Sequence, residues 1–425
     1  MIFVLDDSIL FRRKALQWAQ QFDEVCQLQS HDYPDNYSKI TELLAVQAKH
    51  KFVSTPNQSS FEALENFKTE HPQTWMFGFF SYDLKNEIED LQTSFPNRLD
   101  FPNAYFFVPS TLLQFSDYEV TIESEDPEAV YQAILATELV EVADTAAIAL
   151  QKRMSKDQYL DSFAQLQRHI QQGDIYEVNL CQEFYAEGAD IHPLAVYEKL
   201  SSLSPTPFSV FFKLDDKYVL SASPERFLAK RGTTLISQPI KGTAPRGATP
   251  QEDQARIEGL RNNPKEIAEN VMIVDLVRND LTRSAQAGTV SAVRPLEVHT
   301  FKQVHQLIST ITCTQDPALS TTTVIRNTFP PGSMTGAPKI SAMALCDRYE
   351  NSMRGIYSGA VGYFAPDEDF DFNVIIRSIL YNKSERYLSF HTGGAITYEA
   401  VAEQEYSECM LKASGILKAL NSKLN

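Results

Sequence analysis

Short apolar runs separated by turn residues recur along the chain and predict antiparallel strands. Four of them follow one another closely, at residues 208–214, 218–222, 227–231 and 234–236. Asp215-Asp216 and Gly232 stand at turns between them, which is typical of a meander. In the first 148 residues, similar runs are separated by long polar intervals, at residues 2–5, 75–82, 104–107 and 118–122. This spacing favours an α+β fold over a regular alternation of strands and helices.

Three segments show the apolar period of amphipathic helices. The first begins at Ser155, which forms a capping-box pattern with Gln158, and it ends at Gly173. The second spans residues 264–284 and the third spans residues 401–420. The expected core faces are Tyr159, Phe163, Leu166 and Ile170 in the first helix, Ile267, Val271, Val274 and Leu281 in the second, and Met410, Ala413, Leu417 and Leu420 in the third.

The composition is that of a soluble globular protein, with 43% hydrophobic and 22% charged residues. The net charge of −17 argues against nucleic acid or an anionic membrane as a partner, because either would bind a basic face. It does not argue against a small anionic substrate, which responds to local cations. Since no apolar run is long enough to cross a membrane, we expect a cytoplasmic protein. Five cysteines without CxxC spacing indicate neither a disulfide framework nor a zinc site.

Candidate chemistry begins with Glu225, which follows a strand-like run, and Lys241, which lies between Pro239-Ile240 and Gly242. Rigid and permissive backbone alternate around this lysine, which is how a chain fixes the direction of a side chain. A carboxyl and an amine that project from neighbouring strands into one cavity could act as acid and nucleophile. The alternative interpretation is an exposed Glu and Lys in an ordinary hairpin.

Two of the predicted helices carry paired acids. Glu266 and Glu269 share a face of the second helix, and Glu405, Glu408 and Lys412 form a stripe on the third. Four carboxylates on two helices suit a hard cation such as Mg²⁺, which is held by oxygen ligands. The alternative is that both acidic faces are simply solvated.

Six sequence motifs occur in a fixed order, and together they resemble the chorismate-utilising enzymes. They are SASPERF (221–227), PIKGTAPRG (239–247), NPKEIAENVMIVDLVRNDL (263–281), FPPGSMTGAPK (329–339), YSGAVGYF (357–364) and SECMLKA (407–413). The resemblance covers about residues 155–417 closely and the first 150 residues loosely. It implies an α+β fold like that of anthranilate synthase component I, a large two-sheet β-sandwich with helices packed outside. Residues 1–148 would complete the sheets, and residues 149–425 would form the chorismate-binding catalytic region.

Two positions select a branch of the family by resemblance. Lys241 in PIKGT is similar to members that aminate chorismate at C4, whereas members that aminate C2 have a small residue there. At the position of Glu177, members that add water to C2 have Lys and aminating members usually have Gln. The resemblance therefore implies amination at C4 to 4-amino-4-deoxychorismate, a precursor in p-aminobenzoate and folate synthesis. The alternatives are amination at C2 with loss of pyruvate, as in anthranilate synthase component I, and a catalytically silent regulatory subunit.

The same resemblance assigns site residues and partners. It implies Mg²⁺ bound directly by Glu269 and Glu408 and through water by Glu266 and Glu405. The implied catalytic residues are Glu225, Lys241, Thr243 and His305, and the implied substrate-binding residues are Gly242, Tyr357, Arg377, Gly393, Gly394, Ala395 and Lys412. Gly393, Gly394 and Ala395 are expected to form a glycine-rich turn whose backbone N–H groups line an anion pocket. The expected partners are chorismate, ammonia and a separate glutamine amidotransferase subunit, because no amidotransferase constellation is present in this chain.

The expected mechanism makes two demands on pKa. Lys241 must be neutral to attack C2 as the C4 hydroxyl leaves, so its pKa is expected to be depressed by burial or a nearby cation. Glu225 must carry the proton that the departing hydroxyl takes, so its pKa is expected to be raised. Ammonia would then attack C4 and expel the lysine.

Overall fold

The structure is a computed structural model that describes residues 1–56, 58–140 and 147–424. The strands are β1 (Ile2–Val4), β2 (Glu24–Gln29), β3 (Glu42–Val53), β4 (Met76–Phe80), β5 (Ala104–Phe115), β6 (Glu119–Glu123), β7 (Gln151–Lys152), β8 (Glu177–Ala186), β9 (Phe208–Leu214), β10 (Lys217–Ser223), β11 (Arg226–Arg231), β12 (Thr234–Gln238), β13 (Ile240–Pro245), β14 (Ser291–Thr300), β15 (Val304–Thr314), β16 (Gly336–Ala337), β17 (Ala360–Phe364), β18 (Phe370–Val374), β19 (Ser378–Asn382) and β20 (Tyr387–Ile396).

The helices are α1 (Ser8–Ala19), α2 (Ser60–Glu70), α3 (Lys85–Ile88), α4 (Pro127–Ala136), α5 (Lys156–Gln172), α6 (Pro193–Leu203), α7 (Pro250–Arg261), α8 (Pro264–Thr282), α9 (Thr321–Thr328), α10 (Lys339–Tyr349) and α11 (Ala402–Ala419). Two 3₁₀ turns, η1 (Tyr82–Leu84) and η2 (Gly332–Met334), complete the elements of the described residues. None of these helices is both long and apolar enough to pass through a membrane.

Antiparallel pairing joins the strands into two sheets that share the long strands β3 and β5. The first sheet runs from β4 through β17, β18, β11 and β12 to β15, which also pairs with β13 and β14. The second sheet runs from β2 through β9, β10, β19 and β20 to β8, which also pairs with β7 and β16. Because β3 pairs with β2 and β5 pairs with β4, the two sheets remain one hydrogen-bonded network.

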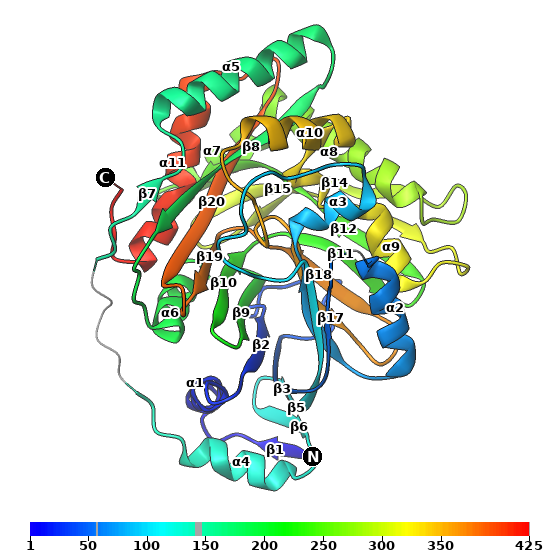
Figure 1. Cartoon of the computed structure of the whole chain (residues 1–425), viewed down its shortest axis with the longest axis vertical. Helices are drawn as coiled ribbons and strands as arrows, with labels where there is room; N and C mark the ends of the chain where they lie inside the picture. Colours follow the sequence, from blue (N-terminus) through cyan, green and yellow to red (C-terminus); the bar gives the residue numbers. More distant parts are fainter. Residues whose placement is uncertain (57, 141–146, 425) are drawn as a thin grey trace.

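The hydrophobic core lies between the two sheets. Phe79 of β4 and Phe212 of β9 are fully buried, and their ring centroids are 5.4 Å apart in an edge-to-face arrangement. Burial of each such ring stabilises the fold by about 1.5–3 kcal/mol. On β10, Val219 faces this core while Leu220 packs on the opposite side beneath α6 and α11. Figure 1 shows the helices around the strands, with α6 and α11 on one side and α2 and α9 on the other. The expected two-sheet sandwich with outer helices is confirmed.

Several predictions that depend on residues close together in the sequence agree with the structure. The meander is present as β9 to β12, and α5 has the expected capping box of Ser155 and Gln158. Gly173 ends α5 with φ +84°, in the left-handed region that favours glycine. All five cysteines are buried and free, in keeping with the absence of a predicted disulfide framework.

The predicted core face of α8 is partly wrong, and that of α11 is confirmed but includes an acid. Val271 is 48% exposed, and Asn270 is fully buried in its place because its amide donates hydrogen bonds to the carbonyls of Lys241 and Leu307. On α11, Ala413 and Leu420 are buried as predicted, and Glu405 is buried as well, with only 3% of its surface exposed. The inner faces of α8 and α11 are therefore partly polar, which a purely hydrophobic period cannot detect.

Candidate active site

Glu225 lies where the chain crosses from the second sheet to the first, between β10 and β11. Its backbone carbonyl accepts a hydrogen bond from the amide of Val374, which fixes the crossing. Its side chain is buried, and burial raises the pKa of the carboxyl to about 7, although Ser333 and the Lys241 ammonium pull the pKa down. The expected raised pKa of Glu225 is confirmed, so a substantial fraction of this carboxyl is protonated at neutral pH.

Lys241 is directed by an irregularity in β13. The register between β13 and β15 shifts between Ile240 and Thr243, and such bulges re-aim a side chain at the edge of a sheet. Gly242 has φ +100°, and a Cβ there would lie 3.0 Å from both the Glu266 carboxylate and the Leu307 side chain. Glycine is required at this position because α8 passes close to a left-handed backbone.

Lys241 forms an ion pair that the sequence did not predict. Its Nζ donates to Oε1 of Glu177, at the start of β8, over 2.5 Å, and both side chains are largely buried. Burial alone would lower the pKa of Lys241, but Glu177, with Glu269 and Glu225 nearby, raises it above the ordinary lysine value. The expectation of a depressed pKa is therefore wrong for this substrate-free structure, because the neighbours of Lys241 are carboxylates rather than cations.

The acids of α8 and α11 face one another across Lys265. The Lys265 ammonium lies 3.4 Å from Oε1 of Glu405 and 3.7 Å from Oε1 of Glu269. Burial followed by repulsion from the other glutamates raises the pKa of Glu266. Burial would also raise the pKa of Glu408, but the ammonium of Lys412, 2.8 Å away, lowers it below the usual range. The two helices thus bring four carboxylates into one electrostatically coupled group.

The four carboxylates of α8 and α11 are of the donor type that suits Mg²⁺, although they do not surround a common point in this structure. Oε1 of Glu269 is buried and has no hydrogen-bond partner, as expected of an oxygen that awaits a ligand. In the described part of the chain, however, no three His, Cys, Asp or Glu side chains lie close enough to hold a metal ion. Lysine ammoniums supply the positive charge instead. The residues fit a hard cation by donor type, and the carboxylates would have to draw away from Lys265 and Lys412 to bind one.

Arg377 and Tyr357 are placed beside this group. Arg377 lies between β18 and β19 with φ +52°, a strained conformation that sets the direction of its side chain. The pKa of Arg377 is below its ordinary value because burial lowers it more than the nearby Tyr357 and Glu408 raise it. Tyr357 is buried and stacks on His391 at a centroid distance of 4.8 Å. A half-buried guanidinium beside a phenol is suited to bind a carboxylate.

Gly393, Gly394 and Ala395 lie within strand β20, so the prediction of a glycine-rich turn is wrong. They pair with β8, and a Cβ on Gly394 would lie 2.7 Å from the Glu405 carboxylate. The carbonyl of Gly393 accepts a hydrogen bond from Lys412 over 2.9 Å. β19 pairs with β20 only as far as Ser389, so the backbone groups on that edge beyond Ser389 have no partner in β19.

Thr243 and His305 lie in different environments, one exposed and the other buried. Thr243 is exposed on β13. His305 is fully buried, and its ring nitrogens lie 2.9 Å from Thr300 Oγ1 and 2.9 Å from Asp253 Oδ1. Since Asp253 also binds Arg246, this histidine ties the segment after β13 to β15. The catalytic roles of Thr243 and His305 stay predictions.

Ser333 is a site residue that the sequence reasoning did not assign. It belongs to η2, within FPPGSMTGAPK, and its hydroxyl is buried near Glu225 and lowers the pKa of that carboxyl. The hydroxyl lies close enough to the Glu225 carboxyl to affect its pKa but makes no hydrogen bond of normal geometry in this structure. The six-motif resemblance contained the signal, because this serine lies in one of the matching segments.

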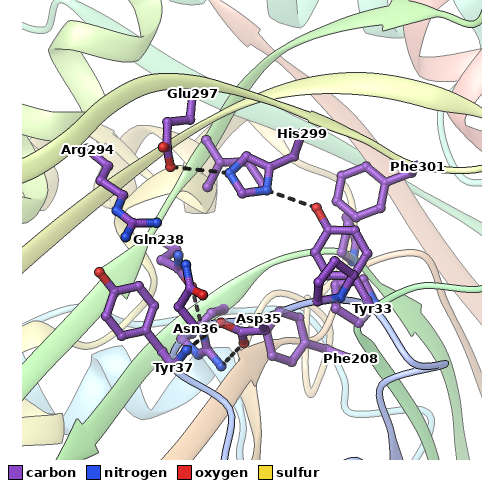
Figure 2. A pocket seen from close by; sticks show the side chains of 15 residues that line it. Tyr33, Asp35, Asn36, Tyr37, Phe208, Gln238, Arg294, Glu297, His299 and Phe301 are labelled. Carbon is purple, nitrogen blue, oxygen red and sulfur yellow. Dashed lines mark hydrogen bonds and ion pairs between the residues drawn. The ribbon is translucent and has the colours of Figure 1, made fainter.

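A pocket borders the β10–β11 crossing, where Pro224 and Arg226, the sequence neighbours of Glu225, help to line it. Figure 2 shows it between the segment of Tyr33 to Tyr37 and strand β14. Its volume is about 490 Å³ including its open mouth. The Tyr33 hydroxyl and Nδ1 of His299 are 2.8 Å apart across one side, and Arg294 extends over another. It contains neither Glu225 nor Lys241, so its size does not locate the chemistry.

Comparison with known proteins defines the family. A model of chorismate binding enzymes matches residues 10–418, and the chain therefore belongs to this family. It is 35% identical over 349 residues to aminodeoxychorismate synthase component 1 from Klebsiella aerogenes, which covers 81% of this chain and 77% of that protein. It is 42% identical over 271 residues to aminodeoxychorismate synthase from Streptomyces griseus, which covers 64% of this chain but only 37% of that longer protein.

A solved structure gives the same result for the fold. Anthranilate synthase component I from Streptococcus pneumoniae superposes with a TM-score of 0.77 at 22% identity, over 91% of this chain and 95% of that one. This likeness confirms the expected fold class and says nothing further about the reaction.

Proposed function

We propose that this chain aminates chorismate at C4 with ammonia and releases 4-amino-4-deoxychorismate. The observation that supports this most directly is a buried lysine, Lys241, aimed by a strand bulge into the same site as a carboxyl, Glu225, that is partly protonated at neutral pH. Relatives that match this chain over most of its length are named aminodeoxychorismate synthase component 1.

The proposed reaction is a double displacement. The amine of Lys241 attacks C2, the ring double bond shifts, and the C4–O bond breaks as Glu225 gives its proton to the leaving oxygen, which departs as water. Ammonia then attacks C4, the double bond shifts back, and the C2–N bond to Lys241 breaks. The C3 enolpyruvyl group is retained throughout, so no pyruvate forms.

Substrate binding is assigned to the charged groups around the pair. Arg377 and Tyr357 would hold the enolpyruvyl carboxylate, and Lys412 with the edge of β20 would face the ring carboxylate. Glu269 and Glu408 would hold Mg²⁺ directly, with Glu266 and Glu405 in its water shell. When bound, the ion would polarise the ring carboxylate and the conjugated system.

The ammonia would be supplied by a glutamine amidotransferase subunit. The Klebsiella aerogenes relative is named component 1, which agrees with a two-component enzyme. We propose no nucleic-acid or anionic-membrane partner, because either would bind a basic face and the chain has a net charge of −17.

Product identification tests the proposal. The purified chain is incubated with chorismate, MgCl₂ and ammonium chloride, and products are separated by chromatography and mass spectrometry while pyruvate is measured with a coupled dehydrogenase. Aminodeoxychorismate without pyruvate is the expected result. Anthranilate with one equivalent of pyruvate would assign the C2-aminating activity instead. Absence of turnover in the presence of an added amidotransferase would favour a regulatory subunit.

A further inference from the structure

The contact between Lys241 and Glu177 raises a question that the proposed reaction must answer. A lysine attacks carbon only as the neutral amine. In this structure the Nζ of Lys241 is instead held as an ammonium against Oε1 of Glu177 at 2.5 Å. The proton must therefore leave Lys241 before the C2–N bond can form.

The surroundings of Lys241 restrict where this proton can go. The charged groups that face it are Glu177 from β8, Glu269 from α8, Glu225 from the β10–β11 crossing and Glu408 from α11. Of these, Glu177 makes the hydrogen bond to the ammonium. The side chains of the pair are only 11% and 5% exposed, so bulk water has little access to the proton.

We propose that Glu177 is a catalytic residue that takes the proton from the Lys241 ammonium and returns it when the lysine is released. Glutamate is suited to this task, whereas the glutamine that is usual in aminating members of the family has no basic oxygen of this strength. The inference rests on the proposed covalent route through Lys241.

Proton transfer along this hydrogen bond preserves the charge balance of a buried site. The N–H bond breaks and an O–H bond forms, so an ion pair becomes a neutral amine beside a neutral carboxylic acid. Loss of the proton to solvent would leave the Glu177 carboxylate buried and unpaired, which is strongly unfavourable. The direct transfer is therefore the route that the surroundings favour.

The remaining protons also balance. After the amine attacks C2 and Glu225 has protonated the leaving oxygen, ammonia bonds to C4 as an ammonium and Lys241 leaves with the electron pair of the C2–N bond. The new C4 ammonium gives one proton to Glu225, which restores the acid. Glu177 returns its proton to Lys241, which restores the ion pair.

The backbone around Glu177 holds the carboxyl in place through these steps. β16 pairs Ala337 with Glu177, and the amide of Tyr176 donates to the Ala337 carbonyl over 2.6 Å. A Cβ on Gly336 would lie 2.1 Å from the Glu177 carbonyl, so the TGAPK segment packs directly on this residue. A fixed acceptor is what a reversible proton transfer needs, because the geometry must survive the departure and return of the lysine.

The test measures the rate at which chorismate modifies Lys241 in the full-length protein. Wild type and Glu177→Gln are mixed with chorismate and MgCl₂ without ammonia, quenched at intervals, and the mass increase on the peptide that contains Lys241 is quantified between pH 6 and pH 9. Glu128→Gln, the same change at an exposed position of α4, is the matched control and is expected to behave as wild type.

We expect Glu177→Gln to form the adduct about 100-fold more slowly than wild type at pH 7, the lower range of general base effects, and to recover as pH rises. Glu177→Asp keeps a carboxylate and is expected to fall between the two, which also covers the case in which the glutamine variant misfolds. Circular dichroism of each variant checks the fold.

The outcomes separate the two proposals. If wild type forms the adduct and Glu177→Gln forms it equally fast or faster, Glu177 does not act as the base. This inference is then overturned, while the covalent route through Lys241 stands. If wild type makes aminodeoxychorismate without any adduct on Lys241, the covalent route fails and the inference fails with it. A slow, pH-dependent glutamine variant with an active aspartate variant supports both.

Discussion

Glu225 is held at a site that destabilises the folded chain at neutral and high pH, and removal of its charge should make this measurable. The pKa of Glu225 is raised from 4.5 to about 7 in the folded state. Below pH 4.5 the carboxyl is protonated both folded and unfolded, so it contributes nothing. As pH rises toward 7, the unfolded chain ionises first, and stability falls.

The size of this effect follows from the shift. One pKa unit corresponds to about 1.4 kcal/mol, so a shift of this size costs about 3 kcal/mol once pH exceeds 7. At pH 5 only about 1 kcal/mol is lost, because this pH lies just above the ordinary pKa of 4.5 and far below the folded-state pKa of about 7. Glu225→Gln cannot ionise, so its stability relative to wild type should improve by about 2–3 kcal/mol between pH 5 and pH 8.

Urea unfolding of both proteins at pH 5 and pH 8, followed by circular dichroism, gives the four free energies of unfolding that are needed. Any fixed effect of the amide on packing is the same at both pH values and cancels in the comparison. Glu128→Gln, at an exposed position, should show no such pH-dependent gain. A Glu225→Gln advantage that is equal at pH 5 and pH 8 would refute the reasoning. Catalytic activity should meanwhile decline above pH 7 in wild type, as the acid loses its proton.

Three further predictions follow from the site. Lys241→Ala should make aminodeoxychorismate at a rate at least about 100-fold below wild type in a product assay; an unchanged rate would favour direct attack by ammonia. Glu408→Gln should weaken Mg²⁺-dependent activity sharply and leave the free energy of unfolding within about 0.5 kcal/mol of wild type; full activity of this variant in chelator would end the metal proposal. Gly242→Ala should destabilise the fold by about 1–3 kcal/mol in urea unfolding, because its φ is +100° and its Cβ would press on Glu266 and Leu307; unfolding at the wild-type midpoint would contradict this.

Sequence reasoning located features whose cause is local. The meander and the capping box at Ser155 depend on residues a few positions apart, and the structure has both. The raised pKa of Glu225 is predicted from the catalytic role that the resemblance implies, whereas its cause in the structure is burial, which is not local. The partner of Lys241 was not predictable, since Glu177 lies 64 positions away and meets it only after two sheets have closed.

Other errors have the same physical origin. A period of apolar residues places a helix but cannot show that a buried face is polar, and Asn270 is buried because it binds two carbonyls. The sequence predicts a turn at Gly393 and Gly394 because glycine adopts backbone conformations that other residues avoid. In the structure they allow the Glu405 carboxylate and β8 to approach a strand closely.

The pairing of β4 with β17 has a consequence for how this chain is made. Phe80 of β4 pairs with Ala360 of β17, so the apolar segment MFGFF is synthesised long before its partner strand exists. During translation this strand has one neighbour, β5, and an open edge that can pair with other nascent chains. Such long-range pairing also makes closure of the first sheet slow. Synthesis of this enzyme at high rates should therefore depend on chaperone protection of the N-terminal strands until β17 has left the ribosome.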